Sequence, residues 1–455
     1  MGASEGYRDL AEAAWTWVLG QVRDDDGPWL PVSVGVDVPA GTPDPKPGPD
    51  RDCLYDGIAG LAPVLAEIAL HRGLTAVEQH LAAGIVARLS RVAVGADEAG
   101  LYEGIAGHVA ALRMLAPGAE TQPLSRIARL QTPDGWATTT DPGSAEPLTD
   151  VIGGSAGIVM TAVWADGRGS PAIAAAGGEA LLAAADTTTG GLDWGMRPGT
   201  PWRGPNFSHG TAGVSAALAV AGTALDRPDF VAAAVLGAQH LLSVGQLEDG
   251  GFVVPHTIPP ANREVEPLTY TWCHGPAGTS QLFAALARAG VEEVGGLTVD
   301  DVRERCLHAV LTSGVPQRLR PGFWDNDGRC CGTAGVGDVL LDAAQDDDDS
   351  ARAGRWLAGA VTMADALVER AAHDRGGAYW RFIEYRIAEP LLPPGTSWMQ
   401  GAAGIAAYLF RVARVLDDGL TAPVVDRPDQ WWAVPATLRT VGSVRPAFDG
   451  AGASR

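Results

Sequence analysis

Lysine is almost absent from this sequence of 455 residues, in which Lys46 is the only one. A phosphate-cradling nucleotide loop needs a lysine after its glycines, and no Gly-Lys-Ser/Thr triplet includes Lys46, so this type of site is excluded. Schiff-base chemistry, which needs a lysine amine, is disfavoured for the same reason. The formal net charge of −21 would repel a phosphate backbone, so we expect no nucleic-acid partner.

Long apolar runs are also missing. No uncharged apolar stretch reaches the roughly 18 residues of a membrane-spanning helix, and the first residues lack the charged-then-apolar pattern of a signal peptide. We therefore expect a cytoplasmic protein with no membrane span. Cysteine is sparse, and an odd number of five predicts free thiols or metal ligands instead of a disulfide framework: Cys53, Cys273, Cys306, Cys330 and Cys331.

Glycine, by contrast, is abundant, with 59 residues, and much of it belongs to a repeated motif. The unit Gly-x-Ala-Gly occurs seven times, beginning at Gly57, Gly104, Gly154, Gly210, Gly275, Gly332 and Gly401. Neighbouring copies lie 47 to 69 residues apart, which is enough for two helices each. A repeat of this period is the first feature to settle, because it determines the whole fold.

The repeat predicts an all-α fold, an α/α toroid. The stretch after each motif, such as TAGVSAALAVAGTAL from residue 211, is apolar on every side, as a buried helix is. The stretches between, such as VDDVRERCLHAVL from residue 299, have a single apolar face and predict half-exposed helices. We expect a double helical barrel of seven inner and seven outer helices, forming one domain over residues 1–455. A proline-rich loop at about 38–52 and an irregular tail after about residue 419 fall outside the repeat.

Segments rich in glycine and aromatic residues lie between the repeats. They predict turns or short hairpins at the ends of helices, around one mouth of the toroid. These segments are PDGW from residue 133, GGLDW from 190, DGGFVV from 249, PGFWDNDG from 321 and RGGAYW from 375.

The residue just before each motif is polar or able to bind metal in six of the seven repeats: Asp56, Glu103, Gly153, His209, His274, Cys331 and Gln400. All seven positions precede an inner helix at the same point. If the inner helices run parallel in a ring, these side chains face one mouth. Helix N-termini also favour anions and thiolates there.

Three cysteines lie within two residues of the motif in two adjacent repeats, Cys273 before one motif and the pair Cys330 and Cys331 before the next. Catalytic zinc commonly takes three protein ligands and leaves a fourth position open, so these residues predict a zinc site. Buried apolar thiols or a vicinal disulfide would be the alternatives, but neither explains the register shared with His209 and His274. Structural roles are expected for Cys306, Cys53 and the core histidine His108.

The seven glycine units, WCHG from residue 272, the Cys-x-Gly motif from residue 330 and WMQGAAG from residue 398 resemble the lanthionine synthetase C-like family over residues 53–416. This resemblance implies a seven-fold double helical barrel with one zinc ion. It also implies Michael-type addition of a cysteine thiol to dehydroalanine or dehydrobutyrine of a precursor peptide, which forms lanthionine or methyllanthionine. Eukaryotic relatives add glutathione to dehydrated residues in proteins instead.

The resemblance assigns the zinc ligands to Cys273, Cys330 and Cys331, the last where the family more often has histidine. It makes His209 and Asp150 active-site residues. An arginine that some bacterial members carry four residues before the first zinc cysteine is replaced here by Thr269.

The reaction needs a proton donor for the enolate left after thiol attack. His209 or His274 could supply it, because histidine titrates near neutrality. Asp150 could orient a histidine or the peptide. The sequence contains no kinase or lyase segment, so a separate dehydratase or kinase/lyase is expected to prepare the dehydrated peptide.

Two other classes of function remain open at this point. A terpene-cyclase-like or glycosidase toroid would use paired carboxylates, for which Asp56 and Glu103 are candidates. A scaffold that presents a peptide groove would need no catalytic residues. The cysteine cluster has no role in a terpene-cyclase-like enzyme or a glycosidase. Zinc bound to the purified protein would therefore distinguish the lanthionine-forming cyclase from these two enzymes.

Overall fold

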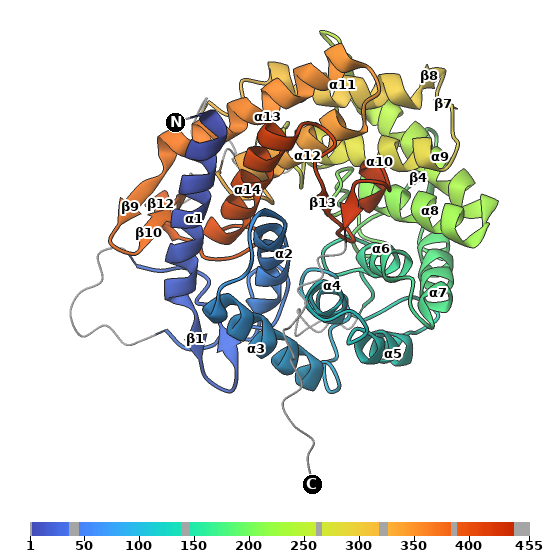
Figure 1. Ribbon diagram of the computed structural model, residues 1–455. Helices are drawn as coiled ribbons and strands as arrows, with labels where there is room; N and C mark the ends of the chain where they lie inside the picture. Colours follow the sequence, from blue (N-terminus) through green and yellow to red (C-terminus); the bar gives the residue numbers. More distant parts are fainter. Residues whose placement is uncertain are drawn as a thin grey trace.

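Fourteen α-helices alternate between two concentric rings in the computed structural model, which describes residues 2–35, 45–137, 146–260, 266–317, 326–383 and 389–440 (Figure 1). The predicted α/α toroid with seven inner and seven outer helices is confirmed. Residues 38–44 of the expected proline-rich loop, most of the segment from residue 321 and everything after Thr440 lie outside the described residues.

The inner ring consists of the helices that follow the glycine motifs. They are buried along almost their whole length, as their alanine-rich sequences predict. Their bounds are α2 Leu61–His71, α4 Ile105–Leu115, α6 Ser155–Ala165, α8 Thr211–Leu225, α10 Pro276–Arg288, α12 Thr333–Asp346 and α14 Ala402–Asp418. A short 3₁₀ helix, η1 (Ile58–Gly60), precedes α2.

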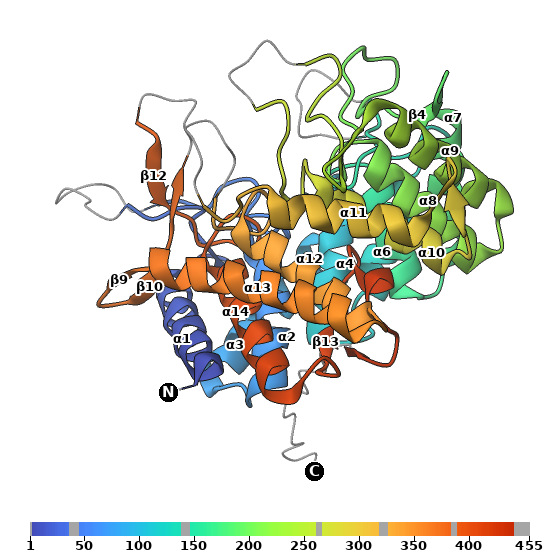
Figure 2. The ribbon, with the colours of Figure 1, turned by 90° about the horizontal axis from the view of Figure 1, so that it is seen from above.

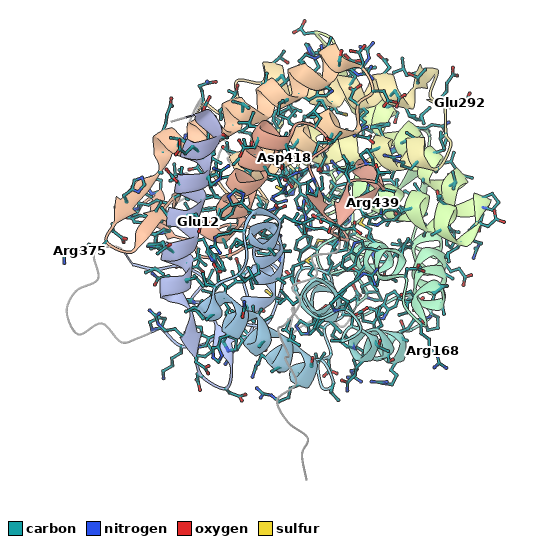
Figure 3. The ribbon with its side chains drawn as sticks, in the orientation of Figure 1. Glu12, Arg168, Glu292, Arg375, Asp418 and Arg439 are labelled. Atoms are coloured by element: carbon teal, nitrogen blue, oxygen red, sulfur yellow. The ribbon has the colours of Figure 1, made fainter. Side chains whose placement is uncertain are left out.

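The outer helices each bury one face. In α11, for example, Val302, Cys306 and Val310 are buried. Charged side chains such as Arg168, Glu292 and Arg375 lie at the periphery of the molecule (Figure 3). The outer bounds are α1 Ala3–Gln21, α3 Ala76–Val92, α5 Thr121–Leu130, α7 Ser170–Ala183, α9 Pro228–Val244, α11 Val299–Thr312 and α13 Ser350–Arg370.

The ring is closed by contact between the two ends of the repeat array. Helix α1, the first in the chain, packs against α14, the last, and α14 packs against α2. Because the first and last helices meet, we propose that the chain folds as a single domain. No helix within the described ranges is long and apolar enough to cross a membrane.

Two-stranded hairpins follow several outer helices, as the glycine-aromatic segments predict. Trp136, Trp194 and Trp380 come just after such turns, and each indole N–H donates to a carbonyl near the end of the preceding outer helix, at 2.8, 2.7 and 2.9 Å. The antiparallel pairs in the described residues are β1 Arg23–Asp24 with β2 Pro28–Trp29, β3 Asp186–Thr188 with β4 Gly191–Asp193, β5 Gln246–Glu248 with β6 Gly251–Val253, β7 Glu293–Val294 with β8 Leu297–Thr298, β9 Ala372–Asp374 with β10 Gly377–Tyr379, and β11 Arg381–Ile383 with β12 Leu391–Pro394.

A belt of backbone hydrogen bonds links the seven repeats just before their glycine motifs. Each bond joins one repeat to the next, and the last returns to the first. We call this the hydrogen-bonded belt, and its N–H to O=C pairs are Tyr55 to Tyr102, Tyr102 to Ile152, Val151 to Ser208, Ser208 to Cys273, Cys273 to Cys330, Cys330 to Met399 and Met399 to Tyr55, at 2.9 to 3.2 Å. The belt therefore fixes which repeats are neighbours and brings Cys273 beside Cys330.

The second glycine of each motif is required by close packing. A Cβ on Gly213 would lie 2.0 Å from the carbonyl oxygen of Phe207 and 2.5 Å from Cγ2 of Val151, in the preceding repeat. The equivalent carbonyl contact recurs in all the other motifs, at 1.8 to 2.7 Å, for Gly60, Gly107, Gly157, Gly278, Gly335 and Gly404. The repeated glycines thus let each inner helix approach its own entry turn and, in six of the seven repeats, a side chain of the preceding repeat.

We expect Gly213→Ala to lower the free energy of unfolding by about 2–3 kcal/mol, because the added methyl group overpacks a contact with backbone. Urea denaturation followed by circular dichroism measures this change. Gly354→Ala is the matched control. Gly354 is exposed on α13 with open space around its Cβ position, so alanine there should stabilise the protein by roughly 0.5–1 kcal/mol. Equal effects at both positions would refute the packing explanation.

Candidate metal centre and acid–base pair

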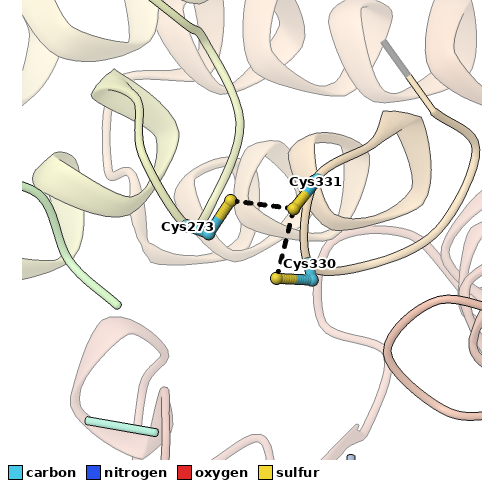
Figure 4. Close-up of side chains that lie close together, drawn as sticks. All are labelled: Cys273, Cys330 and Cys331. Atoms are coloured by element: carbon cyan, nitrogen blue, oxygen red, sulfur yellow. Dashed lines mark hydrogen bonds between the residues drawn. The ribbon is translucent and has the colours of Figure 1, made fainter. Parts of the chain in front are cut away.

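Three thiols converge where the belt joins the fifth and sixth repeats. Cys273 precedes α10, and Cys330 and Cys331 precede α12. The Sγ atom of Cys331 lies 3.1 Å from that of Cys273 and 3.4 Å from that of Cys330 (Figure 4). All three sulfur atoms lie within 4.8 Å of one another, all three residues are buried, and none forms a disulfide. The vicinal disulfide considered above is therefore not formed.

The three thiols fit a zinc ion by both donor type and spacing. Sulfur ligands at about 2.3 Å from one tetrahedral zinc lie roughly 3.8 Å apart, so only small side-chain shifts separate this cluster from a coordinating set. Burial would raise the pKa of the Cys273 thiol, but hydrogen bonds from the two other thiols lower it well below its usual range. The hydrogen bond with Cys273 in turn raises the pKa of Cys330 to about 12. The cluster thus favours one thiolate held by two thiols, and a divalent cation would allow all three to ionise.

Polar side chains surround the sulfur atoms. The Thr271 hydroxyl lies 3.3 Å from Sγ of Cys273. Nε2 of Gln400 lies 3.8 Å from Sγ of Cys331 and donates to the Tyr55 hydroxyl at 2.8 Å. That hydroxyl also hydrogen-bonds Cys330. Groups of this kind orient metal ligands. Tyr55 and Thr271 were missed from the sequence, although Tyr55 shares the register of Cys273 and Cys330, two residues before its motif.

Asp150 and His209 form a close pair on the third and fourth repeats, the fourth being next to the repeat of Cys273. Oδ2 of Asp150 lies 2.7 Å from Nδ1 of His209, and Oδ1 accepts the N–H of Gly153 at 3.1 Å. The aspartate is buried, whereas 30 % of the histidine side chain is exposed. Burial lowers the pKa of His209, but the hydrogen bond and the charge of Asp150 outweigh it, so the pKa is raised. The imidazole therefore keeps its proton to a higher pH than a free histidine.

A family model described as lanthionine synthetase C-like protein matches residues 48–417, most of the chain. The chain belongs to this family. Among solved structures, nisin cyclase is 14 % identical, with a TM-score of 0.52 over 80 % of this chain and 89 % of that one. The GH76 α-mannanase BT2949 of Bacteroides thetaiotaomicron is 10 % identical, with a TM-score of 0.50 over 90 % and 97 %. Both likenesses show the shared fold. No curated protein sequence matches the chain.

The pKa of His274, the other predicted acid of this lanthionine synthetase C-like protein, is shifted in the opposite direction from that of His209. Its ring lies 5.5 Å from that of His209 and 4.2 Å from that of His256, between centroids. Burial, together with the charge of His209, lowers the pKa of His274 to about 3, so this imidazole is neutral near pH 7. His256 follows β6, and no sequence motif predicts that it lies near the site. Its backbone carbonyl accepts from Nδ2 of Asn206 at 2.9 Å.

The carboxylates of the same mouth are partly buried. Burial raises the pKa of Glu103 to about 7, and the charges of Asp150 and Glu98 add to the shift. Burial also raises the pKa of Asp56.

The residues with expected structural roles lie elsewhere. Cys306 is buried in α11 without another thiol, Sγ of Cys53 accepts the N–H of Asp56 at 3.3 Å, and His108 is buried in α4. Thr269, which replaces the arginine of some family members, is buried and donates to the carbonyl of His274 at 2.7 Å. This threonine therefore supports the turn that carries Cys273 and His274.

Proposed function

We propose that the protein is a zinc-dependent peptide cyclase of the cytoplasm. It would add cysteine thiols of a precursor peptide to dehydroalanine or dehydrobutyrine, and so form lanthionine or methyllanthionine rings. A separate dehydratase would supply the dehydrated peptide. The observation that carries this proposal is the buried cluster of Cys273, Cys330 and Cys331 beside the Asp150–His209 pair.

The chemistry follows from these two groups of residues. Cys273, Cys330 and Cys331 would hold the zinc ion, which when bound lowers the pKa of a substrate thiol so that it reacts as a thiolate. As sulfur bonds to the β-carbon, the double bond opens and negative charge collects on the enolate. His209 then gives a proton to the α-carbon. Asp150 holds Nδ1 of this imidazole and stabilises its charge, which leaves Nε2 as the nitrogen free to act.

The test combines a metal measurement with a peptide assay. Purified protein should contain one zinc ion per chain, and a dehydrated peptide with free cysteines should lose its alkylatable thiols without changing mass. Removing zinc with a chelator should stop the reaction, and adding zinc should restore it. A peptide that gains the mass of glutathione instead would identify a thiol transferase. The proposal would be refuted if the purified protein contained no zinc and changed the dehydrated peptide neither alone nor in the presence of glutathione.

A further inference from the structure

The chain beyond α14 returns into the toroid. Residues 420–440 contain β13 (Val424–Val425), η2 (Trp431–Ala433) and β14 (Arg439–Thr440), and β13 pairs with β14 in parallel. Figure 1 shows β13 inside the ring of inner helices, and Figure 2 shows it at the opposite end of the molecule from β12. These residues lie outside the family match, which ends at residue 417. We call residues 420–440 the plug.

Inner-helix side chains dock the plug by its backbone. Nε2 of Gln345, on α12, donates to the carbonyls of Leu420 and Ala422 at 3.2 and 2.9 Å. Nε of Arg414, on α14, donates to the carbonyl of Pro423 at 3.0 Å. In the reverse sense, a plug side chain, the Trp432 indole, donates to the backbone carbonyl of Gln281, on α10, at 3.0 Å. Because carbonyls in the interior need donors, these bonds specify one seated position for the segment.

Arg427, a plug residue, belongs to a buried cluster of charged side chains. Its guanidinium lies 2.7 Å from Oδ2 of Asp338, and Arg329 reaches the same oxygen at 2.6 Å, while Arg411 lies 2.8 Å from Oδ1. All four side chains are at most 8 % exposed. Burial alone would raise the pKa of Asp338, but the three guanidinium groups lower it well below its usual range. Buried charges at this density depend on each partner being in place.

The buried charge cluster adjoins the thiol cluster in the sequence. Arg329 precedes Cys330, and the N–H groups of both residues donate to the carbonyl of Met399, at 2.8 and 3.0 Å. The guanidinium groups of Arg329 and Arg427 also lie over the ring of Trp398, at 4.1 and 5.6 Å from its centroid. The side chain of Arg329 is thus held by Asp338 and the aromatic ring, and its backbone belongs to the turn that presents Cys330.

We propose that the plug closes the toroid beneath the thiol cluster and, through Arg427, Asp338 and Arg329, fixes the turn that presents Cys330 and Cys331. Arg427 is in this view a positioning residue. The inference rests on the proposed metal site. A small cavity beneath the cluster is lined by Trp272, Arg329 and Met399 together with plug residues, so the plug shares a boundary with the residues that precede both cysteine turns.

The test is the affinity of the folded protein for Zn²⁺ alone, measured by competition with a chromophoric chelator. Arg427→Met should weaken zinc binding by about 10–100-fold, as the loss of groups that orient metal ligands commonly does. Phe230→Ala is the control for general destabilisation. Phe230 is fully buried in outer helix α9, where its ring packs toward Gly178 of α7 and lies under the guanidinium of Arg227, so its loss should lower the melting temperature and leave zinc affinity unchanged.

Arg427→Lys serves as the second variant if Arg427→Met does not fold. Lysine keeps the charge but lacks the planar fork that reaches Asp338 and covers Trp398, so an intermediate loss of affinity is expected. Wild-type affinity in a folded Arg427 variant would overturn the role of the plug while leaving the metal site intact. Absence of zinc binding by the wild-type protein would instead refute the proposed function. If Phe230→Ala lost as much zinc affinity as Arg427→Met, the plug would affect zinc binding only through the general stability of the protein, and the positioning role would be refuted.

Discussion

Cys273→Ala is expected to leave the protein without zinc. The substitution removes one of three converging thiols, and the two that remain belong to adjacent residues of one turn. Since changes next to a metal ligand already cost about 10–100-fold in affinity, losing a ligand should cost more than about 100-fold. Metal analysis should show near-zero zinc in the purified variant and one ion per chain in the wild type, and thioether formation by the variant should fall to the uncatalysed rate.

Two other cysteine variants make this result specific. Cys306→Ala also deletes a buried thiol, but one with no other thiol nearby, so its zinc content should be unchanged. Cys331→His replaces a thiol by another good zinc ligand, the one the family more often carries there, and should retain zinc. Stoichiometric zinc in Cys273→Ala would exclude Cys273 as an essential ligand. Loss of zinc in all three variants would point to misfolding.

The fold could be predicted from the sequence because its repeat has a physical cause. A Cβ at the second glycine of each motif would strike a backbone carbonyl, so the motif persists in seven copies that are otherwise different. The hydrogen-bonded belt includes the residue two positions before each first glycine and, in the third repeat, also Val151, three positions before Gly154. For that reason the register of Cys273, Cys330 and Cys331 in the sequence places them together in space.

Other parts of the site depend on contacts that no local pattern records. The ring of His256, in the segment after β6, lies 4.2 Å from that of His274, and the Thr271 hydroxyl lies next to Sγ of Cys273 in the same turn. The plug was predicted as an irregular tail after about residue 419, since it lacks helical periodicity. Its burial arises from partners on inner helices far away in the sequence, such as Asp338 and Gln281.

His209→Asn should lower the rate of thioether formation by about 10²–10⁴-fold while leaving zinc content unchanged, because it removes the proposed proton donor and no metal ligand. Asparagine is close in size to the imidazole but cannot carry the proton at neutral pH. His308→Asn is the control: this histidine lies on outer helix α11, where Nε2 is 3.1 Å from the carbonyl oxygen of Asp249, and its loss should not change the rate.

The pH dependence distinguishes an acid from a residue that only shapes the mouth. A general acid works while protonated, so the rate should fall as pH rises through the pKa of His209. Asp150 raises that pKa by its hydrogen bond and charge. Asp150→Asn should therefore move the alkaline fall in rate to lower pH, with less effect on the rate at the acidic end. Initial rates at matched zinc content across pH 5 to 9 measure this shift. An unmoved alkaline limb in Asp150→Asn, or an alkaline limb that persists in His209→Asn, would show that another group delivers the proton.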